Sequence, residues 1–344
     1  MAEFTNLEDF TFKVEAASLW IICSFFPRSD CHLLTSHATD EIPSQIVTML
    51  SNSHNLHSLS IISLQGRGWS LDVALLLLLP SYRPSLRSLT LQGVACNLSI
   101  ENFEVDNRTL VQFLLSLSEL EQLSLGGSIG RRNLELRMMM KDSLEEGERE
   151  VLFPKLRDFE GTSTNFIWLI SGGNSPITKL RINELEPIDE GEFASLLVAL
   201  PPTMKFLSIA FARWDPLRPT VGAAIERIAT SCPNLQSLEI ATVSSLRFSE
   251  RSMTRTSVAS SYADIIHAIL AFPLLTSLRL PPASVCGITG DLSLVAAEFF
   301  DACSNLLRLD FAGEERDGRS VAVASSRWER RCSREGTMYA VEVM

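Results

Sequence analysis

The chain has 344 residues, a formal net charge of −11 at pH 7 and a sequence pI of about 5.1. Hydrophobic residues make up 46% and charged residues 21%, which excludes an intrinsically disordered protein and a small disulfide-stapled domain. The acidic balance also argues against a general nucleic-acid binder, since such proteins carry a basic surface.

A short motif, L-x-x-L-x-L, recurs along the chain and predicts a strand at each copy. The copies begin, in chain order, at Asn6, Asn55, Ser85, Glu119, Lys155, Ile177, Thr203, Asn234, Leu274 and Asn305. Their first apolar positions are 49 residues apart at the first gap and 21–40 residues apart at the others. The long first gap leaves room for a degenerate repeat near Cys31–Ala38.

A helix is predicted before most of these strands, because apolar residues recur there at spacings of three and four. The helical segments are 107–120, 191–203, 220–235, 261–275 and 291–306. In the last segment, Leu294, Ala297, Phe300 and Cys303 are expected to share one face. Each repeat is thus a helix, a tight turn, a short strand and a longer return loop.

Two insertions interrupt the repeats: the charge-rich Arg131–Phe153, and Ser244–Tyr262, which is rich in Ser, Thr and Arg. Loops of this length are functional or disordered, and serines beside arginines in the second are candidates for phosphorylation. Residues 1–312 carry the repeats. The tail, Gly313–Met344, has no repeat signal and is expected either to be disordered or to form a degenerate C-terminal cap.

One such repeat cannot bury its own apolar face, so neighbouring repeats must stack and share a continuous core. Alternate side chains of a strand point the same way, so the second and third apolar residues of the motif point inward together. On these motifs the chain resembles leucine-rich-repeat proteins of the ribonuclease-inhibitor-like class. The resemblance implies an α/β solenoid of about 10–11 irregular repeats, with parallel strands on the concave face and helices on the convex face.

The pattern Pro-x-Leu-x-x-Leu-x-Leu after the helices is similar to that of fungal F-box/leucine-rich-repeat proteins. In that family an F-box module docks a ubiquitin-ligase scaffold through a Skp-type adaptor, and the repeats present a target. The segment Glu41–Ser51 imitates the opening of an F-box, but a repeat strand follows at Asn55, where an F-box would continue as a helix. The chain is therefore expected to be a truncated or diverged member that lacks the F-box.

The outward positions of the strands form the predicted binding face, since they alternate with the buried positions of the motif. In the middle of the chain an acidic row, Asp158 and Glu160, adjoins a basic row, Lys179 and Arg181. These rows are interpreted either as lateral salt bridges between neighbouring strands or as a polar region that binds a partner.

Aromatic residues and an arginine gather along one later strand and its exit loop, at Phe206, Phe211, Arg213 and Trp214. This composition is typical of hot spots in protein interfaces; the alternative is that Phe211 and Trp214 cover the edge of the core. Glu239 and Arg279, on the next two strands, complete the predicted partner-binding set.

The common motifs of catalysis are missing from the sequence, including G-x-x-x-x-G-K-S/T, G-x-S-x-G, H-E-x-x-H and Cys-x-x-Cys. We interpret Gly126–Arg132 as the exit of a strand, with a phosphate nest as the alternative. His54 and His57 are interpreted as exposed turn residues, with metal binding as the alternative. No enzyme activity, metal or cofactor is therefore predicted.

The sequence predicts a monomeric, non-enzymatic protein-interaction scaffold whose partner it does not identify. Two alternatives stay open: an F-box-type ubiquitin-ligase substrate receptor whose F-box lies upstream or has been lost, and a GTPase-regulating repeat protein. No membrane partner is expected, because the longest apolar run, Val73–Leu79, is too short to span a bilayer. No nucleic-acid partner is expected either, because of the acidic charge balance. An acidic N-terminus without signal-peptide features, together with seven scattered cysteines, indicates the cytoplasm or the nucleus.

Overall fold

The structure is a computed structural model of the chain, which divides into two compact units, Met1–Ile177 and Thr178–Met344. It describes residues 7–15, 18–25, 29–35, 56–63, 85–92, 114, 116–126, 153–170, 176–185, 190–211, 220–242, 262–288, 290–312, 315–316, 321–322, 326–332 and 338–343. Both units contain a run of parallel strands.

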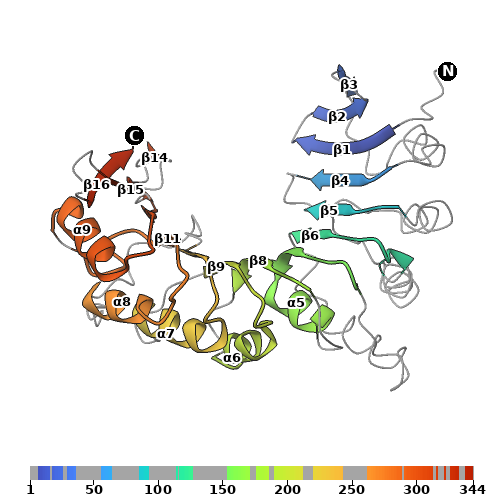
Figure 1. Ribbon diagram of the computed structural model, residues 1–344. Helices are drawn as coiled ribbons and strands as arrows, with labels where there is room; N and C mark the ends of the chain where they lie inside the picture. The colour runs from blue at the N-terminus through green and yellow to red at the C-terminus, as the bar shows by residue number, and fades with distance from the viewer. Residues whose placement is uncertain are drawn as a thin grey trace, which may run out of the picture. The chain divides into compact units, whose positions relative to one another are not determined.

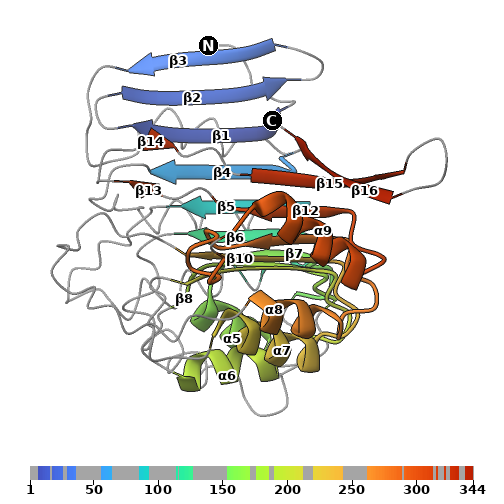
Figure 2. The same ribbon diagram turned by 90° about the vertical axis from the view of Figure 1, so that its left-hand side faces the viewer.

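The first unit is built mainly on strands that follow the repeat motif. Its described strands are β1 (Leu7–Glu15), β2 (Ser18–Phe25), β3 (Ser29–Thr35), β4 (Ser58–Ser63), β5 (Ser88–Gln92), β6 (Gln122–Gly126) and β7 (Asp158–Thr162). Their spatial order is β3-β2-β1-β4-β5-β6-β7, and Figure 2 shows β3 to β6 stacked one above another. β1 runs parallel to β4, and β5, β6 and β7 continue the parallel run. The helix α5 (Ser163–Ile170) follows β7 directly.

Before β4 the chain departs from the repeat pattern. β2 pairs antiparallel with β1, and β3 pairs antiparallel with β2. The degenerate repeat predicted near Cys31–Ala38 is therefore wrong, because β3 runs through Cys31 as part of an antiparallel meander. The physical reason is the length of the connections. Only two residues join β1 to β2 and three join β2 to β3, whereas a parallel return needs a crossover of about a dozen residues or more.

The second unit alternates strands and helices. They are β8 (Lys179–Leu185), α6 (Glu190–Ala199), β9 (Phe206–Phe211), α7 (Val221–Ser231), β10 (Ser237–Thr242), α8 (Tyr262–Ile269), β11 (Ser277–Leu280), α9 (Leu292–Ala302) and β12 (Arg308–Phe311). The five strands pair in parallel and in sequence order. In Figure 1 the four helices lie along one side of these strands. We call the side chains on the opposite side of β8–β12 the strand face.

The apolar positions of the motif form the core. Its first apolar position is at most 2% exposed at every described copy, from Leu56 to Leu306. The second apolar positions of the last four copies are fully buried and pair in register across neighbouring strands: Leu207, Leu238, Leu278 and Leu309. This register and the alternation of buried and outward residues confirm the predicted α/β leucine-rich-repeat fold.

The helices confirm the four predictions made for the second unit, whereas α5 had no prediction. The buried face of α9 differs in part from the expected one. Val295, Ala296, Phe299 and Phe300 are buried, whereas Leu294 is 66% exposed. An α-helix has 3.6 residues per turn, so its buried stripe advances by three and four residues alternately rather than by three alone.

Beyond β12 the chain forms an antiparallel hairpin. The described strands of this tail are β13 (Glu315–Arg316), β14 (Val321–Ala322), β15 (Ser326–Cys332) and β16 (Met338–Val343). β15 pairs antiparallel with β12 and with β16, and Trp328 is buried. Arg330 donates hydrogen bonds to two carbonyl oxygens at the end of α9, those of Cys303 and Ser304, and lies 5.4 Å from the ring centroid of Phe300. The hairpin thus covers the outer edge of β12, and Arg330 ties it to the turn that follows α9.

Thr220 caps the N-terminus of α7. Its hydroxyl accepts a hydrogen bond from the backbone N–H of Ala223 at 3.2 Å, which satisfies one of the amides that a first helical turn leaves unpaired. Replacing Thr220 by alanine is expected to lower the free energy of unfolding by about 1 kcal/mol, measured by urea denaturation. Thr220→Ser keeps the hydroxyl and serves as the control. An equal loss in both variants would contradict the capping role.

Two buried cysteines make the stability of the protein depend on pH. Burial raises the pKa of the Cys232 and Cys286 thiols to about 12, from an ordinary value of 9.0. In the unfolded chain these thiols ionise first, so their contribution to stability is complete below pH 9 and is lost as the pH rises towards 12. Each thiol is expected to lower the free energy of unfolding by about 1.4 kcal/mol per pH unit within that window.

Urea denaturation at pH 8 and at pH 10 measures this effect. Wild type is expected to lose more stability between the two pH values than Cys286→Ala, which has no thiol to ionise at that position. The comparison is made within each protein, so any cavity left by the alanine cancels. An identical loss in both proteins would show that the Cys286 thiol does not carry the pH dependence.

Candidate functional site

The structure places half of the predicted binding residues on the strand face of the second unit. Lys179 and Arg181 lie on β8, Phe206 on β9, Glu239 on β10 and Arg279 on β11. The first four are half-buried and Arg279 is exposed. Each points outward because the next residue along its strand is apolar and buried in the core, and successive side chains of a strand alternate between its two sides.

Asp158 and Glu160 lie in the first unit, at the half-buried outward positions of β7. They alternate with Phe159 and Gly161, which face the core. The structure therefore gives these two acidic residues the outward orientation that the motif predicts. Their predicted salt bridges with Lys179 and Arg181 stay a prediction.

Parallel pairing aligns the outward side chains of the second unit in two rows that cross the strands. One row consists of Lys179, Phe206, Ser237, Ser277, Arg308 and Glu329. The other consists of Arg181, Ser208, Glu239, Arg279, Asp310 and Arg327. Neighbouring strands lie about 4.8 Å apart, so one extended ligand segment can contact several members of a row.

Phe206 contacts two cations of the neighbouring strand β8. The Lys179 Nζ atom is 5.8 Å from the centroid of the Phe206 ring, and the Arg181 Cζ atom is 5.1 Å from it. Both distances suit cation–π interactions, which hold long cationic side chains against the ring. The half-buried ring and its two cations thus form an ordered amphipathic surface at one end of the strand face.

Phe211 belongs to the core rather than to the strand face. It is 8% exposed and packs edge-on against Phe193 of α6, with ring centroids 5.9 Å apart. Of the two interpretations, the structure favours the one in which Phe211 covers the edge of the core. Arg213 and Trp214 lie outside the described residues. So do Glu41–Ser51 and most of the two insertions.

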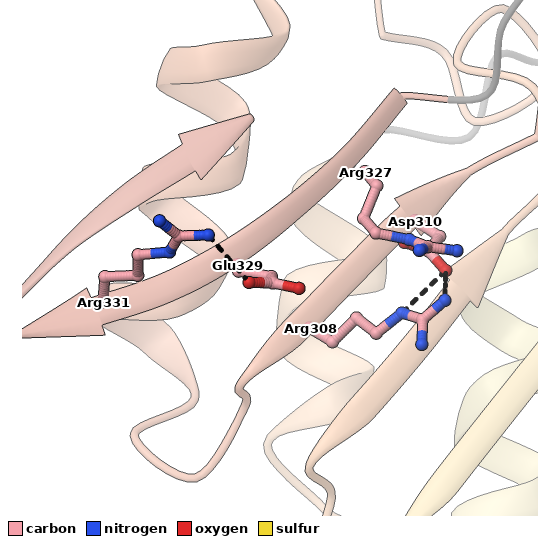
Figure 3. Close-up of polar contacts among 5 residues, drawn as sticks. All are labelled: Arg308, Asp310, Arg327, Glu329 and Arg331. Atoms are coloured by element: carbon pink, nitrogen blue, oxygen red, sulfur yellow. Dashed lines mark hydrogen bonds and ion pairs between the residues drawn. The ribbon is translucent and has the colours of Figure 1, made fainter. Parts of the chain in front are cut away.

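Charged residues of β12 meet an arginine of the tail in a group that the repeat motif does not predict (Figure 3). The Asp310 carboxylate accepts hydrogen bonds from Arg308 Nε at 3.0 Å and from Arg327 Nε at 3.1 Å, and Arg308 Nη2 lies 2.9 Å from it. Asp310 is only 7% exposed, although the motif predicts an outward position for it. Its burial results from β15, which brings Arg327 over it. The only signal for these ion pairs in the sequence is the spacing of Arg308 and Asp310, two residues apart on one side of a strand.

Glu239 and Arg279 are register partners on neighbouring strands. Within the described part of the chain, neither side chain takes part in a hydrogen bond or an ion pair. Two opposite charges at the centre of the strand face therefore keep their hydrogen-bonding capacity for solvent or for a ligand.

The described residues contain no cluster of three His, Cys, Asp or Glu side chains that could hold a metal ion. Among the helices that the structure describes, none has the length and apolarity needed to cross a membrane. The site is a surface of charged, hydroxyl and aromatic side chains on consecutive strands. Such a surface suits recognition of another macromolecule.

Comparison with known proteins gives the following matches. No protein-family model and no curated protein sequence matches the chain. Among solved structures, 21 chains match. One is the leucine-rich repeat-containing protein LegL7 from Legionella pneumophila, which is 15% identical with a TM-score of 0.44, over 80% of this chain and 91% of that chain.

Proposed function

We propose that this chain is a non-enzymatic scaffold that binds a protein partner through the strand face of its second unit. The observation that carries the proposal is the contrast between the two sides of each strand. Inward positions repeat the same apolar residues, whereas outward positions change from strand to strand between cations, anions, serines and an aromatic ring. A rigid frame with individually variable contact residues is the arrangement that repeat proteins use for binding.

The composition of the strand face supports this function. Phe206, Lys179 and Arg181 combine an aromatic ring with ordered cations, and aromatic and arginine side chains are enriched in interface hot spots. Glu239 and Arg279 present charges without a described intramolecular partner. The partner, the cytoplasmic or nuclear location and the monomeric state all belong to the proposal.

Proximity labelling in cells with the full chain as bait tests the proposal. The test variant combines Phe206→Ala with Arg279→Glu. The control is Lys205→Glu, which changes an exposed cation that precedes β9 and lies outside the strand face. A reproducible partner should be labelled by wild type and by the control but lost with the test variant. A partner set that the test variant leaves unchanged would overturn the proposal.

The same experiment distinguishes the ubiquitin-ligase alternative. Recovery of both a Skp-type adaptor and a cullin with wild type would replace the scaffold by an F-box-type substrate receptor. Recovery of a small GTPase whose GTP hydrolysis the purified chain stimulates would favour a GTPase-regulating function. A partner of another kind, lost with the test variant, supports the scaffold alone.

A further inference from the structure

The second unit separates its charges between two sides. On the strand face and its continuation on β15, the cations outnumber the anions. The cations are Lys179, Arg181, Arg279, Arg308, Arg327 and Arg331, and the anions are Glu239, Asp310 and Glu329. On the described helices and their caps, the acidic residues Glu192, Glu226, Asp264, Asp291, Glu298 and Asp301 outnumber the basic residues Arg227 and His267. Although the chain has a net charge of −11, the strand face of its second unit carries more cations than anions.

Two arginines, Arg308 and Arg327, hold the buried carboxylate of Asp310, and a third, Arg279, lies at the register position of Asp310 on the neighbouring strand. We call Arg279, Arg308 and Arg327 the arginine cluster. Arg308 and Arg327 hold the carboxylate with the contacts described above, yet their side chains are 42% and 44% exposed. A guanidinium has five N–H donors, so each keeps donors directed at the solvent. Arg279 is the register partner of Asp310 on β11 and is exposed.

The fold itself orders this group of charges. One nearly buried carboxylate neutralises one of three cations and fixes the orientation of two of them. The Arg308 and Arg327 guanidiniums come from β12 and from the hairpin, so the fold itself brings them together (Figure 3). Oriented guanidiniums recognise carboxylates through paired hydrogen bonds.

We infer that the occupant of the strand face is an acidic polypeptide segment, with Asp or Glu side chains on the arginine cluster and an apolar residue on Phe206. The inference rests on the proposed function and specifies the chemistry of its partner. Four strand spacings separate Phe206 on β9 from Arg327 on β15, which is about 19 Å, the span of about six residues of extended chain. A short linear segment that crosses the strands thus reaches both contacts.

The charges that flank the cluster favour a polypeptide over a nucleic acid. Glu239 and Glu329 stand beside the arginines on the same face. A phosphate backbone carries a charge at every nucleotide and would meet these carboxylates, whereas a polypeptide can place its acidic residues selectively.

Selection from a library of random peptides displayed on phage tests the inference, with the immobilised full chain as target. The selected peptides are expected to be rich in Asp and Glu and to carry one aromatic or aliphatic residue. A synthetic copy is then titrated by fluorescence anisotropy against wild type, Arg279→Glu and the control Lys205→Glu. Both variants change the net charge equally. Arg279→Glu should weaken binding by about tenfold or more, and Lys205→Glu by less than about twofold.

The other outcomes separate the inference from the proposed function. Neutral or basic peptides whose binding is lost with Arg279→Glu or Phe206→Ala would overturn the acidic chemistry and leave the scaffold proposal standing. Peptides whose affinity is unchanged by either substitution would overturn the acidic chemistry and the scaffold proposal together. If no peptide is selected, the inference that a short acidic segment occupies the strand face is wrong. Equal affinity for the selected peptide and for a single-stranded oligonucleotide of the same charge would overturn the assignment to a polypeptide.

Discussion

Replacing Phe159 by alanine is expected to lower the free energy of unfolding by about 3–5 kcal/mol. The Phe159 ring is completely buried and packs against Phe166 of α5, with ring centroids 5.8 Å apart. The substitution removes that packing and leaves a cavity between β7 and α5, which the surrounding structure fills only in part. Urea denaturation followed by circular dichroism measures the loss. Arg157→Ala, at an exposed position of the same repeat, is the control and should stay within about 0.5 kcal/mol of wild type.

Gly161 supplies an independent test of the same packing. A Cβ atom at Gly161 would lie 2.8 Å from Phe159 Cζ and 3.1 Å from the Leu125 carbonyl oxygen. The ring of Phe159 therefore occupies the space that a leucine fills at this position in β5 and β6. Gly161→Leu should destabilise wild type, and should be less harmful in a Phe159→Leu background. Strict additivity of the two substitutions would contradict this account.

Replacing Asp310 by alanine is expected to loosen the C-terminal hairpin and to lower the free energy of unfolding by about 2 kcal/mol. The substitution leaves the guanidiniums of Arg308 and Arg327 close together without the carboxylate that binds them. Removing one partner of a fully buried ion pair costs about 3–5 kcal/mol; the value here is smaller because both arginines are partly exposed to water. Urea denaturation measures stability, and limited trypsin digestion measures cleavage at the arginines of β15.

Glu329→Ala is the matched control for Asp310→Ala. Glu329 also pairs with an arginine, Arg331, at 3.3 Å, but the two side chains are 40% and 52% exposed. Such a pair contributes at most about 1 kcal/mol. Trypsin should therefore cut Asp310→Ala faster than Glu329→Ala at the β15 arginines that both variants retain. Equal cleavage rates in the two variants would show that Asp310 does not hold the hairpin.

The repeat strands could be predicted from sequence because burial repeats there with a simple rule. A position such as Leu238 must be apolar in every repeat, since its neighbours Leu207 and Leu278 surround it in the same layer. The outward residues follow from alternation alone, which is why Lys179 and Glu239 were assigned correctly to the exposed side of their strands.

The ends of the array could not be predicted by the same rule. β2 and β15 lack the leucine motif. The direction of β2 follows from its short connection to β1, and that of β15 from its pairing with β12 and β16. Asp310 shows the consequence: its outward position is correct, but its burial depends on Arg327, seventeen residues later. Charge pairing of this kind leaves no periodic trace in a sequence. Phe211 was ambiguous for a related reason, because a residue at the end of a strand can face either the core or the solvent.

The uninterrupted register of β9 to β12 has a consequence for how binding specificity changes in evolution. The first apolar positions of these strands are 31, 40 and 31 residues apart, yet the pairing of Leu207, Leu238, Leu278 and Leu309 never shifts. The length of a return loop is thus uncoupled from the geometry of the strands. Insertions can accumulate in one repeat, and a single outward residue can be exchanged, while the other contact residues keep their places. Recognition of a new ligand can therefore be acquired one repeat at a time.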